Sequence, residues 1–166
     1  MKIKKIDRKS YIFLEKIRSN QVITLREINE DNYDECIKLE VNEEQSAFVA
    51  SNIYSIAQAY IYRETVKLFG IYAEEMLIGF VMLNMEKDKD EYWICRFMID
   101  RNYQKRGYGK KAMKEIIDFF RKEKIRKINL SFEPENILAM KLYSACGFKE
   151  TGEMDEDGEI IMEMRI

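Results

Sequence analysis

The chain has 166 residues, 46% of them hydrophobic and 35% charged, and a formal net charge of −2. This length fits one domain with a sizeable core, and the balanced charge leaves no dominant single-sign field. The sequence contains no histidine, which excludes Ser-His-Asp and Cys-His catalysis, imidazole acid–base chemistry and histidine metal sites.

The cysteines and the apolar runs favour a cytosolic protein without a metal site. The three cysteines are widely spaced and form no CxxC pair, so neither a disulfide framework nor a zinc site is indicated. The longest clean apolar run, residues 78–83, is too short to span a membrane, and the apolar stretch at residues 11–14 is too short for a signal peptide. We expect the cysteines to be reduced and mostly packed.

The first twenty residues differ from the rest of the chain. They hold seven Lys and Arg residues against two acids, a pattern that fits a packed accessory helix or a loose basic arm. No aromatic interleaving accompanies the charge, which argues against nucleic-acid binding. We therefore separate a basic extension at residues 1–20 from a folded domain at residues 21–166.

The apolar periodicity predicts an alternation of strands and helices with an antiparallel meander in the middle of the chain. In chain order we expect a strand at 22–27, helices at 29–38 and 45–63, strands at 66–73, 77–85 and 91–100, a helix at 108–122, a strand at 125–132, a helix at 135–146, and a hairpin of 148–151 with 159–165. The 108–122 helix is amphipathic, and Gly147 is a stop signal for the 135–146 helix. No linker or repeat divides the chain.

The segment at residues 97–111 combines a strand, a glycine-containing turn and a helix start. This order points several backbone N–H groups and the positive end of a helix dipole at one spot. Cations oppose the dipole in a first helical turn, yet Lys105, Arg106, Lys110 and Lys111 cluster here. The segment therefore predicts an anion site, with a simple turn beside a solvated lysine face as the alternative.

Charge is segregated along the sequence. Residues 27–44 hold eight acids against one base, whereas residues 101–127 hold eleven bases against three acids. A cleft lined by one sign concentrates ligands of the other, so we expect an anionic cofactor at the basic segment and a cationic substrate at the acidic one. Glu40, Glu43 and Glu44, just before an apolar run, are the candidate pocket acids, while the earlier acids fit the wet side of a helix.

Two motifs resemble those of the GNAT acetyltransferases. The segment from Gln104 to Gly109 fits the family pattern Q/R-x-x-G-x-G/A, and residues 136–148, with Asn136, Tyr143 and Gly147, fit the second motif. More narrowly, residues 39–52 and 92–94 resemble the bacterial spermine/spermidine acetyltransferases of that family. The resemblance implies an α/β (α+β) single domain with a mixed, mostly antiparallel sheet of about six to seven strands flanked by about four helices.

The resemblance also implies acetyl-CoA as the cofactor. The turn would hold the coenzyme A pyrophosphate with its N–H groups, and the strand before it would splay to expose main-chain groups to the pantetheine arm. Asn136 would steady the cofactor from the second motif. The expected cofactor-binding residues are Phe97, Met98, Ile99, Gln104, Lys105, Arg106, Gly107, Tyr108, Gly109, Lys110, Asn136 and Tyr143.

The resemblance implies direct attack of an amine on the acetyl thioester. Tyr143 would protonate the departing thiolate, although a core aromatic on a helix face is the alternative role. The proton of the amine would go to Glu133, to Glu91 or to a chain of waters, and Glu133 could equally be only a loop acid. A covalent route through Cys95 or Cys146 is disfavoured, because apolar surroundings raise a thiol pKa.

The expected acceptor is a primary amine of a polyamine such as spermine or spermidine. Glu40, Glu43, Glu44 and Glu91 would pair with its ammonium groups, and Tyr92 or Trp93 would pack on it. A peptide or protein N-acetyltransferase, and a coenzyme A-binding sensor without turnover, are the alternatives. We expect no nucleic-acid or membrane partner, and a homodimer is left open.

Overall fold

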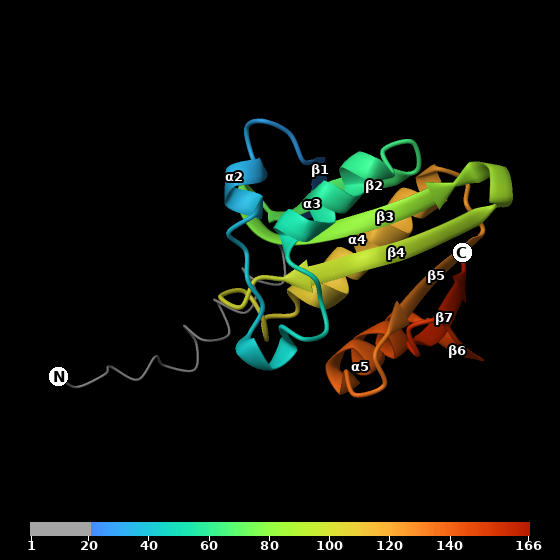
Figure 1. Cartoon of the computed structure of the whole chain (residues 1–166). Helices are drawn as coiled ribbons and strands as arrows, with labels where there is room; N and C mark the ends of the chain where they lie inside the picture. Colours follow the sequence, from blue (N-terminus) through green and yellow to red (C-terminus); the bar gives the residue numbers. More distant parts are fainter. Residues whose placement is uncertain (1–20) are drawn as a thin grey trace, which may run out of the picture.

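A computed structural model describes residues 21–166, and the predicted basic extension at 1–20 lies outside the described residues. Seven strands form one sheet in the order β1-β2-β3-β4-β5-β7-β6 (Figure 1). The elements are β1 (Ile23–Glu27), α2 (Tyr33–Cys36), η1 (Glu43–Gln45), α3 (Asn52–Ile61), β2 (Val66–Ala73), β3 (Met76–Glu86), η2 (Lys87–Lys89), β4 (Glu91–Ile99), α4 (Tyr108–Lys122), β5 (Lys127–Phe132), α5 (Ile137–Cys146), β6 (Lys149–Met154) and β7 (Ile160–Arg165).

The sheet is mixed and mostly antiparallel, as predicted. Every neighbouring pair of strands is antiparallel except β4 and β5, which run parallel. The parallel ladder is only two residue pairs long, Trp93 with Asn129 and Ile94 with Leu130. Beyond Ile94 and Leu130 the two strands are no longer paired, which opens the sheet at its centre.

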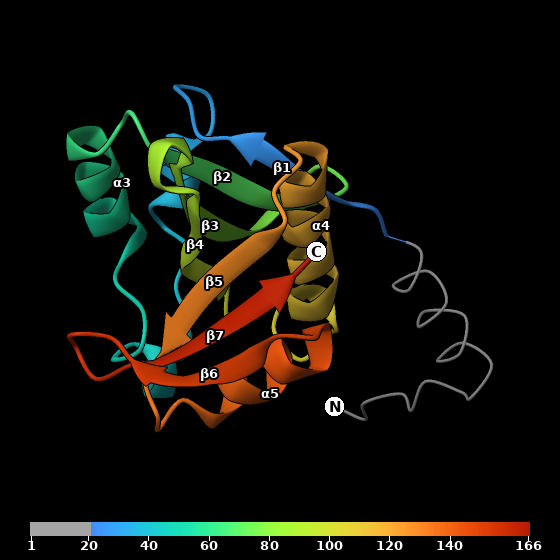
Figure 2. The ribbon, with the colours of Figure 1, turned by 90° about the vertical axis from the view of Figure 1, so that its right-hand side faces the viewer.

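Helices cover both faces of the sheet. Figure 2 shows α4 on one side of the strands and α3 on the other, and α5 contacts α4. The predicted amphipathic helix is confirmed as α4, whose apolar stripe packs into the larger core. Its buried residues are Tyr108, Ala112, Met113, Ile116, Ile117 and Phe120.

The prediction of a helix at residues 29–38 is wrong in length, because α2 has only four residues. Asn29 and Asn32 explain the difference. The Asn29 N–H donates to Asn32 Oδ1 at 2.9 Å, and the Asp31 N–H donates to Asn29 Oδ1 at 2.9 Å. Such side-chain bonds offer the backbone turns in place of a helical ladder.

The predicted helix at residues 45–63 is also too long. It divides into η1, an irregular stretch and α3. Ser51 marks the true start, because its hydroxyl accepts a hydrogen bond from the Tyr54 N–H at 3.2 Å and caps α3. Residues 46–50 therefore form a loop, and this loop reaches the site described below.

Candidate active site

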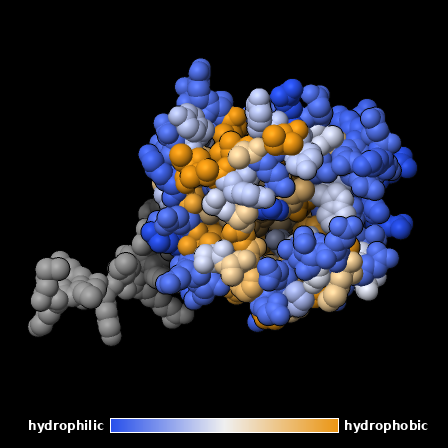
Figure 3. All heavy atoms as spheres, viewed as in Figure 1, coloured by the Kyte–Doolittle hydropathy of each residue, from blue (hydrophilic) through white to orange (hydrophobic). Residues whose placement is uncertain are grey.

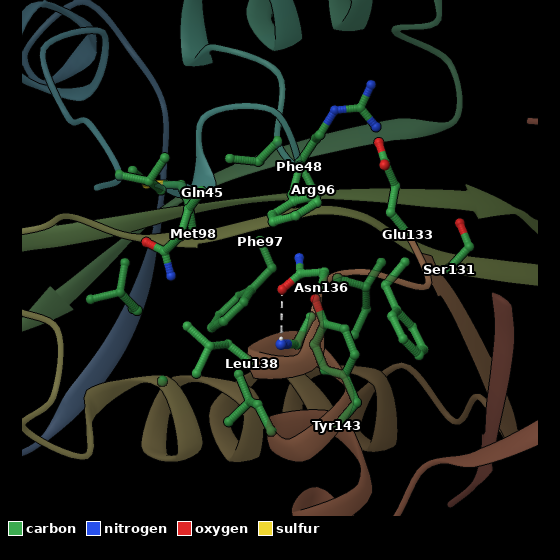
Figure 4. A pocket seen from close by; sticks show the side chains of 18 of the residues that line it. Gln45, Phe48, Arg96, Phe97, Met98, Ser131, Glu133, Asn136, Leu138 and Tyr143 are labelled. Carbon is green, nitrogen blue, oxygen red and sulfur yellow. Dashed lines mark hydrogen bonds between the residues drawn. The ribbon is translucent and has the colours of Figure 1, made fainter. Parts of the chain in front are cut away.

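A cavity of about 670 Å³ opens where β4 and β5 diverge. Its walls come from β4, the end of β5, α5, the turn at 104–109, the loop at 45–50 and the turn at 155–159. Figure 3 shows a hollow near the middle of this face, bordered by apolar and charged residues, and Figure 4 shows its interior. A β-bulge lies opposite Met82 and Leu83, where Cys95 is the extra residue of β4. Because β4 and β5 are not paired beyond Ile94 and Leu130, the free edge of β4 faces the cavity there.

Gln104 fastens the turn at 104–109 to its neighbours. Its Nε2 donates to Gln45 Oε1 and to the Ile99 carbonyl, both at 2.8 Å, and its Oε1 accepts from Asn42 Nδ2 at 2.8 Å. The amide therefore joins η1, β4 and the turn. The structure gives Gln104 a positioning role beside the predicted contact with a ligand.

Gly107 begins α4 in a left-handed conformation with φ of 80°. Nothing lies within 4 Å of an added Cβ there, so the backbone angle, not space, requires glycine. Within residues 21–166 no side chain caps α4, and no acid lies in the first turn of this helix. An αL residue followed by a helix N-terminus is an arrangement that binds phosphate, and the turn fits one.

The other turn residues surround this N-terminus. Lys105 also has a positive φ, 59°, and lines the cavity. Arg106 lies over the Tyr103 ring at 5.8 Å from its centroid. The buried Tyr108 donates its hydroxyl proton to the Gln21 side chain. A Cβ at Gly109 would meet Leu142 at an ordinary 3.6 Å, so packing does not explain that glycine.

Apolar residues of β4 continue the wall beyond the turn. Phe97, Met98 and Ile99, the predicted contacts of the pantetheine arm, all line the cavity. Met98 and Ile99 are buried. These three residues lie beyond the end of the β4–β5 ladder at Ile94, where the sequence predicted that the strands splay.

Asn136 and Tyr143 bring the second motif to the cavity. Asn136 caps α5, since its Oδ1 accepts from the Ala139 N–H at 3.1 Å (Figure 4), which leaves its amide NH₂ as the group to offer a ligand. Tyr143 packs edge-on between Phe132 and Phe148, with ring centroids 6.1 and 6.2 Å away. Tyr143 is therefore a core aromatic that also lines the cavity, a position compatible with either of the roles considered for it.

Burial raises the pKa of Tyr143 well above its ordinary value, and the negative charge of Glu159 and the nearby Cys146 raise this pKa further. The phenol is therefore held in its neutral, protonated form. Burial likewise raises the thiol pKa of Cys95 to about 11 and, to a smaller extent, that of Cys146. Neither thiol is activated as a nucleophile.

Of the six predicted acceptor-binding residues, Trp93 alone lines the cavity. Glu40 forms an ion pair with Arg101 Nη2 at 3.0 Å, and Glu43 and Glu44 lie in η1 away from the lining. Tyr92 is buried in the core. The exposed Glu91 lies at the start of β4, opposite Glu86 in the hairpin.

Charged and polar residues other than the predicted acceptor-binding set line the cavity. Glu133 does so, as predicted, and it is joined by residues that the sequence analysis did not single out: Arg96, Ser131, Asp155, Asp157 and Glu159. The sequence signal was the run of four acids in residues 155–159, which was interpreted only as a hairpin turn. The antiparallel register of β5 with β7 carries this turn to the cavity.

The acids of the 155–159 turn differ in the hydrogen bonds that hold their side chains. Asp155 Oδ1 accepts from the N–H groups of Asp157 at 3.1 Å and Glu159 at 2.9 Å, so this carboxylate shapes the turn itself. Asp157 is exposed at the tip. Glu159 is half-buried, and its Oε2 accepts a hydrogen bond from the Ser131 hydroxyl at 2.5 Å.

Arg96 and Glu133 face each other across the cavity wall. Figure 4 shows their side chains pointing toward one another. Arg96 Nη1 donates to the Cys95 carbonyl at 2.7 Å, while its buried Nε has no hydrogen-bond partner within the described residues. The two side chains border the cavity together but form no ion pair within residues 21–166.

The sequence model of the Acetyltransferase (GNAT) family matches residues 23–148. The chain belongs to this family. It is an acetyl-CoA-dependent N-acetyltransferase, which confirms the predicted enzyme class and cofactor. No helix among residues 21–166 has the length and apolarity needed to cross a membrane.

Among similar proteins, the spermine/spermidine N(1)-acetyltransferase of Bacillus subtilis strain 168 is 33% identical over 84% of this chain and 96% of its own length. The structure of a spermidine N-acetyltransferase from Vibrio cholerae, in complex with CoA and spermine, superposes with a TM-score of 0.67 and 22% identity over 87% of this chain and 94% of that one. An aminoglycoside acetyltransferase, AAC(6')-Ib, in complex with coenzyme A reaches a TM-score of 0.72 with 17% identity over 87% and 95%. These structures share the fold of this GNAT enzyme.

Proposed function

We propose that this GNAT enzyme transfers the acetyl group of acetyl-CoA to a primary amine of a polyamine such as spermine or spermidine. The observation that carries the proposal is the set of acids on the cavity lining, where Glu133, Asp157 and Glu159 occur together with Trp93. Carboxylates attract ammonium groups, and an indole face binds cations and methylene chains. The identity with the spermine/spermidine acetyltransferase adds support.

The turn at 104–110 is the proposed site for the donor. Its N–H groups at the start of α4 would hold the pyrophosphate, with Lys105, Arg106 and Lys110 adding charge. The edge of β4 at Phe97, together with Met98, Ile99 and Asn136, would hold the pantetheine arm. When bound there, acetyl-CoA supplies the acetyl thioester.

The residues of β4 and α5 would then perform the chemistry. Main-chain N–H groups at the open edge of β4 polarise the thioester carbonyl as the amine attacks. Tyr143 donates its phenolic proton to the departing thiolate. The raised pKa of Tyr143 keeps its phenol protonated at neutral pH and therefore able to donate in this step.

A panel of acceptors tests this function. Spermine, spermidine, a diamine, a peptide with a free N-terminus and an aminoglycoside are each assayed with acetyl-CoA. We expect the highest kcat/KM with spermine or spermidine. If only the peptide is acetylated, the enzyme is a peptide N-acetyltransferase, and if coenzyme A binds but no acceptor is acetylated, it is a sensor; either outcome contradicts the proposal.

A further inference from the structure

We propose that Glu159, held in place by Ser131, is the carboxylate that takes the proton from the reactive ammonium of the acceptor. Amines of this class are protonated at neutral pH and attack only as free amines. A chain without histidine needs another group to receive this proton. The inference rests on the proposed acid role of Tyr143, which locates the reacting atoms near that residue.

The carboxylates on the cavity differ in how they are held. Asp155 accepts two N–H groups of its own turn, and Asp157 is exposed at the tip. Glu133 points toward Arg96 (Figure 4), and no hydrogen bond orients its carboxylate within the described residues. Among the cavity-lining carboxylates of residues 21–166, Glu159 is the one held by a side chain of β5, the hydroxyl of Ser131.

Three observations place Glu159 at the reacting end. Its Oε2 accepts a hydrogen bond at 2.5 Å from the hydroxyl of Ser131, the penultimate residue of β5. The pairing of Phe132 with Ile160 sets Glu159 at the same end of the β5–β7 ladder as Glu133. Its charge is also near enough to raise the pKa of Tyr143.

The hydrogen bond from Ser131 leaves the Glu159 carboxylate able to accept a proton. The Ser131 hydroxyl occupies one site on Oε2, whereas an ionised carboxylate offers about four lone-pair positions over two oxygens. The remaining positions can accept an ammonium proton. The bond to Ser131 also limits the rotation of the side chain, so the carboxylate is oriented before the acceptor binds.

The proton balance of the reaction closes with these groups. Glu159 takes one proton from the ammonium and later passes it to solvent. The free amine then attacks the carbonyl carbon, so the C–N bond forms and the thioester C–S bond breaks. Tyr143 gives its proton to the sulfur, and the second proton of the amine nitrogen restores the phenol. One ammonium and one thioester yield one amide, one thiol and one proton.

Other titratable groups face the same cavity and must be separated from Glu159 in any pH experiment. They come from β4, the residue after β5, the turn at 104–109 with the start of α4, α5 and the turn before β7: Cys95, Arg96, Glu133, Lys105, Tyr108, Tyr143, Asp155 and Asp157. Glu156 offers a matched control, because it is an exposed glutamate in the same turn and is absent from the cavity lining.

The test measures kcat and KM against pH for wild type and for Glu159→Gln, Glu133→Gln, Ser131→Ala and Glu156→Gln. The acceptor is the amine that wild type acetylates fastest, so loss of the polyamine assignment leaves the test intact. We expect Glu159→Gln to lower kcat at neutral pH by about 100-fold, the lower range for losing an acid–base group, and Ser131→Ala by a smaller factor. Glu156→Gln should match wild type.

The pH arm separates proton transfer from a structural role. Near pH 10, where the acceptor is largely a free amine, the defect of Glu159→Gln should shrink by about tenfold or more. The inference is overturned if kcat is unchanged and only KM rises, if the defect is constant with pH, or if Glu133→Gln shows the pH-dependent loss instead. Tyr143→Phe, measured in parallel, reports separately on the acid.

Discussion

The two ends of the cavity are built in different ways. The proposed donor end is one continuous segment, residues 97–111, which contributes residues 97–99, 104, 105, 108 and 109 to the cavity lining and includes the N-terminus of α4. The proposed acceptor end is assembled from Trp93 and Arg96 on β4, residues 131–133 at and just after the end of β5, and the turn at 155–159. A backbone site is fixed by local conformation, whereas a side-chain site depends on strand register, so the two ends respond differently to substitution.

Tyr143 lines the cavity and is the proposed acid, so its replacement should have the largest effect among the predictions that follow. We expect Tyr143→Phe to lower kcat by about 100-fold, while acetyl-CoA affinity stays near the wild-type value because only a hydroxyl is lost. Steady-state kinetics with calorimetric binding of coenzyme A measures both. An unaltered kcat would remove the acid role of Tyr143.

The pH dependence of wild type sharpens the same assignment. Because the pKa of Tyr143 is raised, its proton is retained to higher pH than in an ordinary tyrosine. We expect kcat to show no fall attributable to loss of the acid below pH of about 10, the ordinary tyrosine value. A decline between pH 7 and 8 that disappears in Tyr143→Phe would contradict this expectation.

A substitution at Gly107 tests the donor end of the cavity separately from the acceptor end. Alanine at a φ of 80° costs roughly 1–2 kcal/mol, and relief of that strain would move the N–H groups. We expect Gly107→Ala to raise the KM for acetyl-CoA by about tenfold and to leave the KM for spermine within about twofold. The KM values of both substrates provide the measurement.

Gly152 provides the matched control for Gly107. It has a φ of 85° with nothing within 4 Å of an added Cβ, and it lies in β6, away from the cavity lining. Gly152→Ala should lose similar stability without changing either KM. Equal rises in the KM for acetyl-CoA in both variants would show that strain alone, and not the donor site, is responsible.

Asn136 tests whether the cap of α5 supports the cavity. Its replacement with alanine removes the bond to the Ala139 N–H and should lower stability by about 1 kcal/mol, or Tm by about 3 °C. Ser51→Ala removes the corresponding cap of α3. We expect a similar Tm in both variants but a lower affinity for coenzyme A only in Asn136→Ala, and equal affinities would limit Asn136 to capping.

Ionic strength should have the smallest effect and should distinguish acceptors by charge. An acidic cavity end attracts spermine more strongly than a monoamine, and salt screens that attraction over about 10 Å at 0.1 M. We expect the KM for spermine to rise about threefold between low and high salt, and that for a monoamine to rise less. Equal changes would argue against electrostatic steering by the acids.

The donor end could be predicted from the sequence because its determinants are contiguous. The order of strand, turn and helix, and the spacing of Gly107 and Gly109, follow from local conformation, and the structure has the predicted α4 with its buried stripe. The β4–β5 opening was expected only from the resemblance to the GNAT family, which implies that the strand before this turn splays. The side-chain hydrogen bonds of Gln104 could not be predicted, because they join it to residues about sixty positions away in the sequence.

The acceptor end was harder to predict because acids close in sequence need not face a cavity. Glu40 is held by Arg101, and Glu43 and Glu44 lie in η1, which the expected long helix at 45–63 obscured. Asp157 and Glu159 reach the cavity only through the pairing of β7 with β5. The acidic segment at residues 27–44 therefore does not supply the acids that line the cavity.

Separate binding measurements on two variants test the division of the cavity most directly. Calorimetry with coenzyme A and with spermine is performed on wild type, Gly107→Ala and the double variant Asp157→Asn/Glu159→Gln. The account predicts that Gly107→Ala weakens only coenzyme A binding and that the double variant weakens only spermine binding, each by about tenfold, or 1.4 kcal/mol. Wild-type affinity for spermine in the double variant would contradict it.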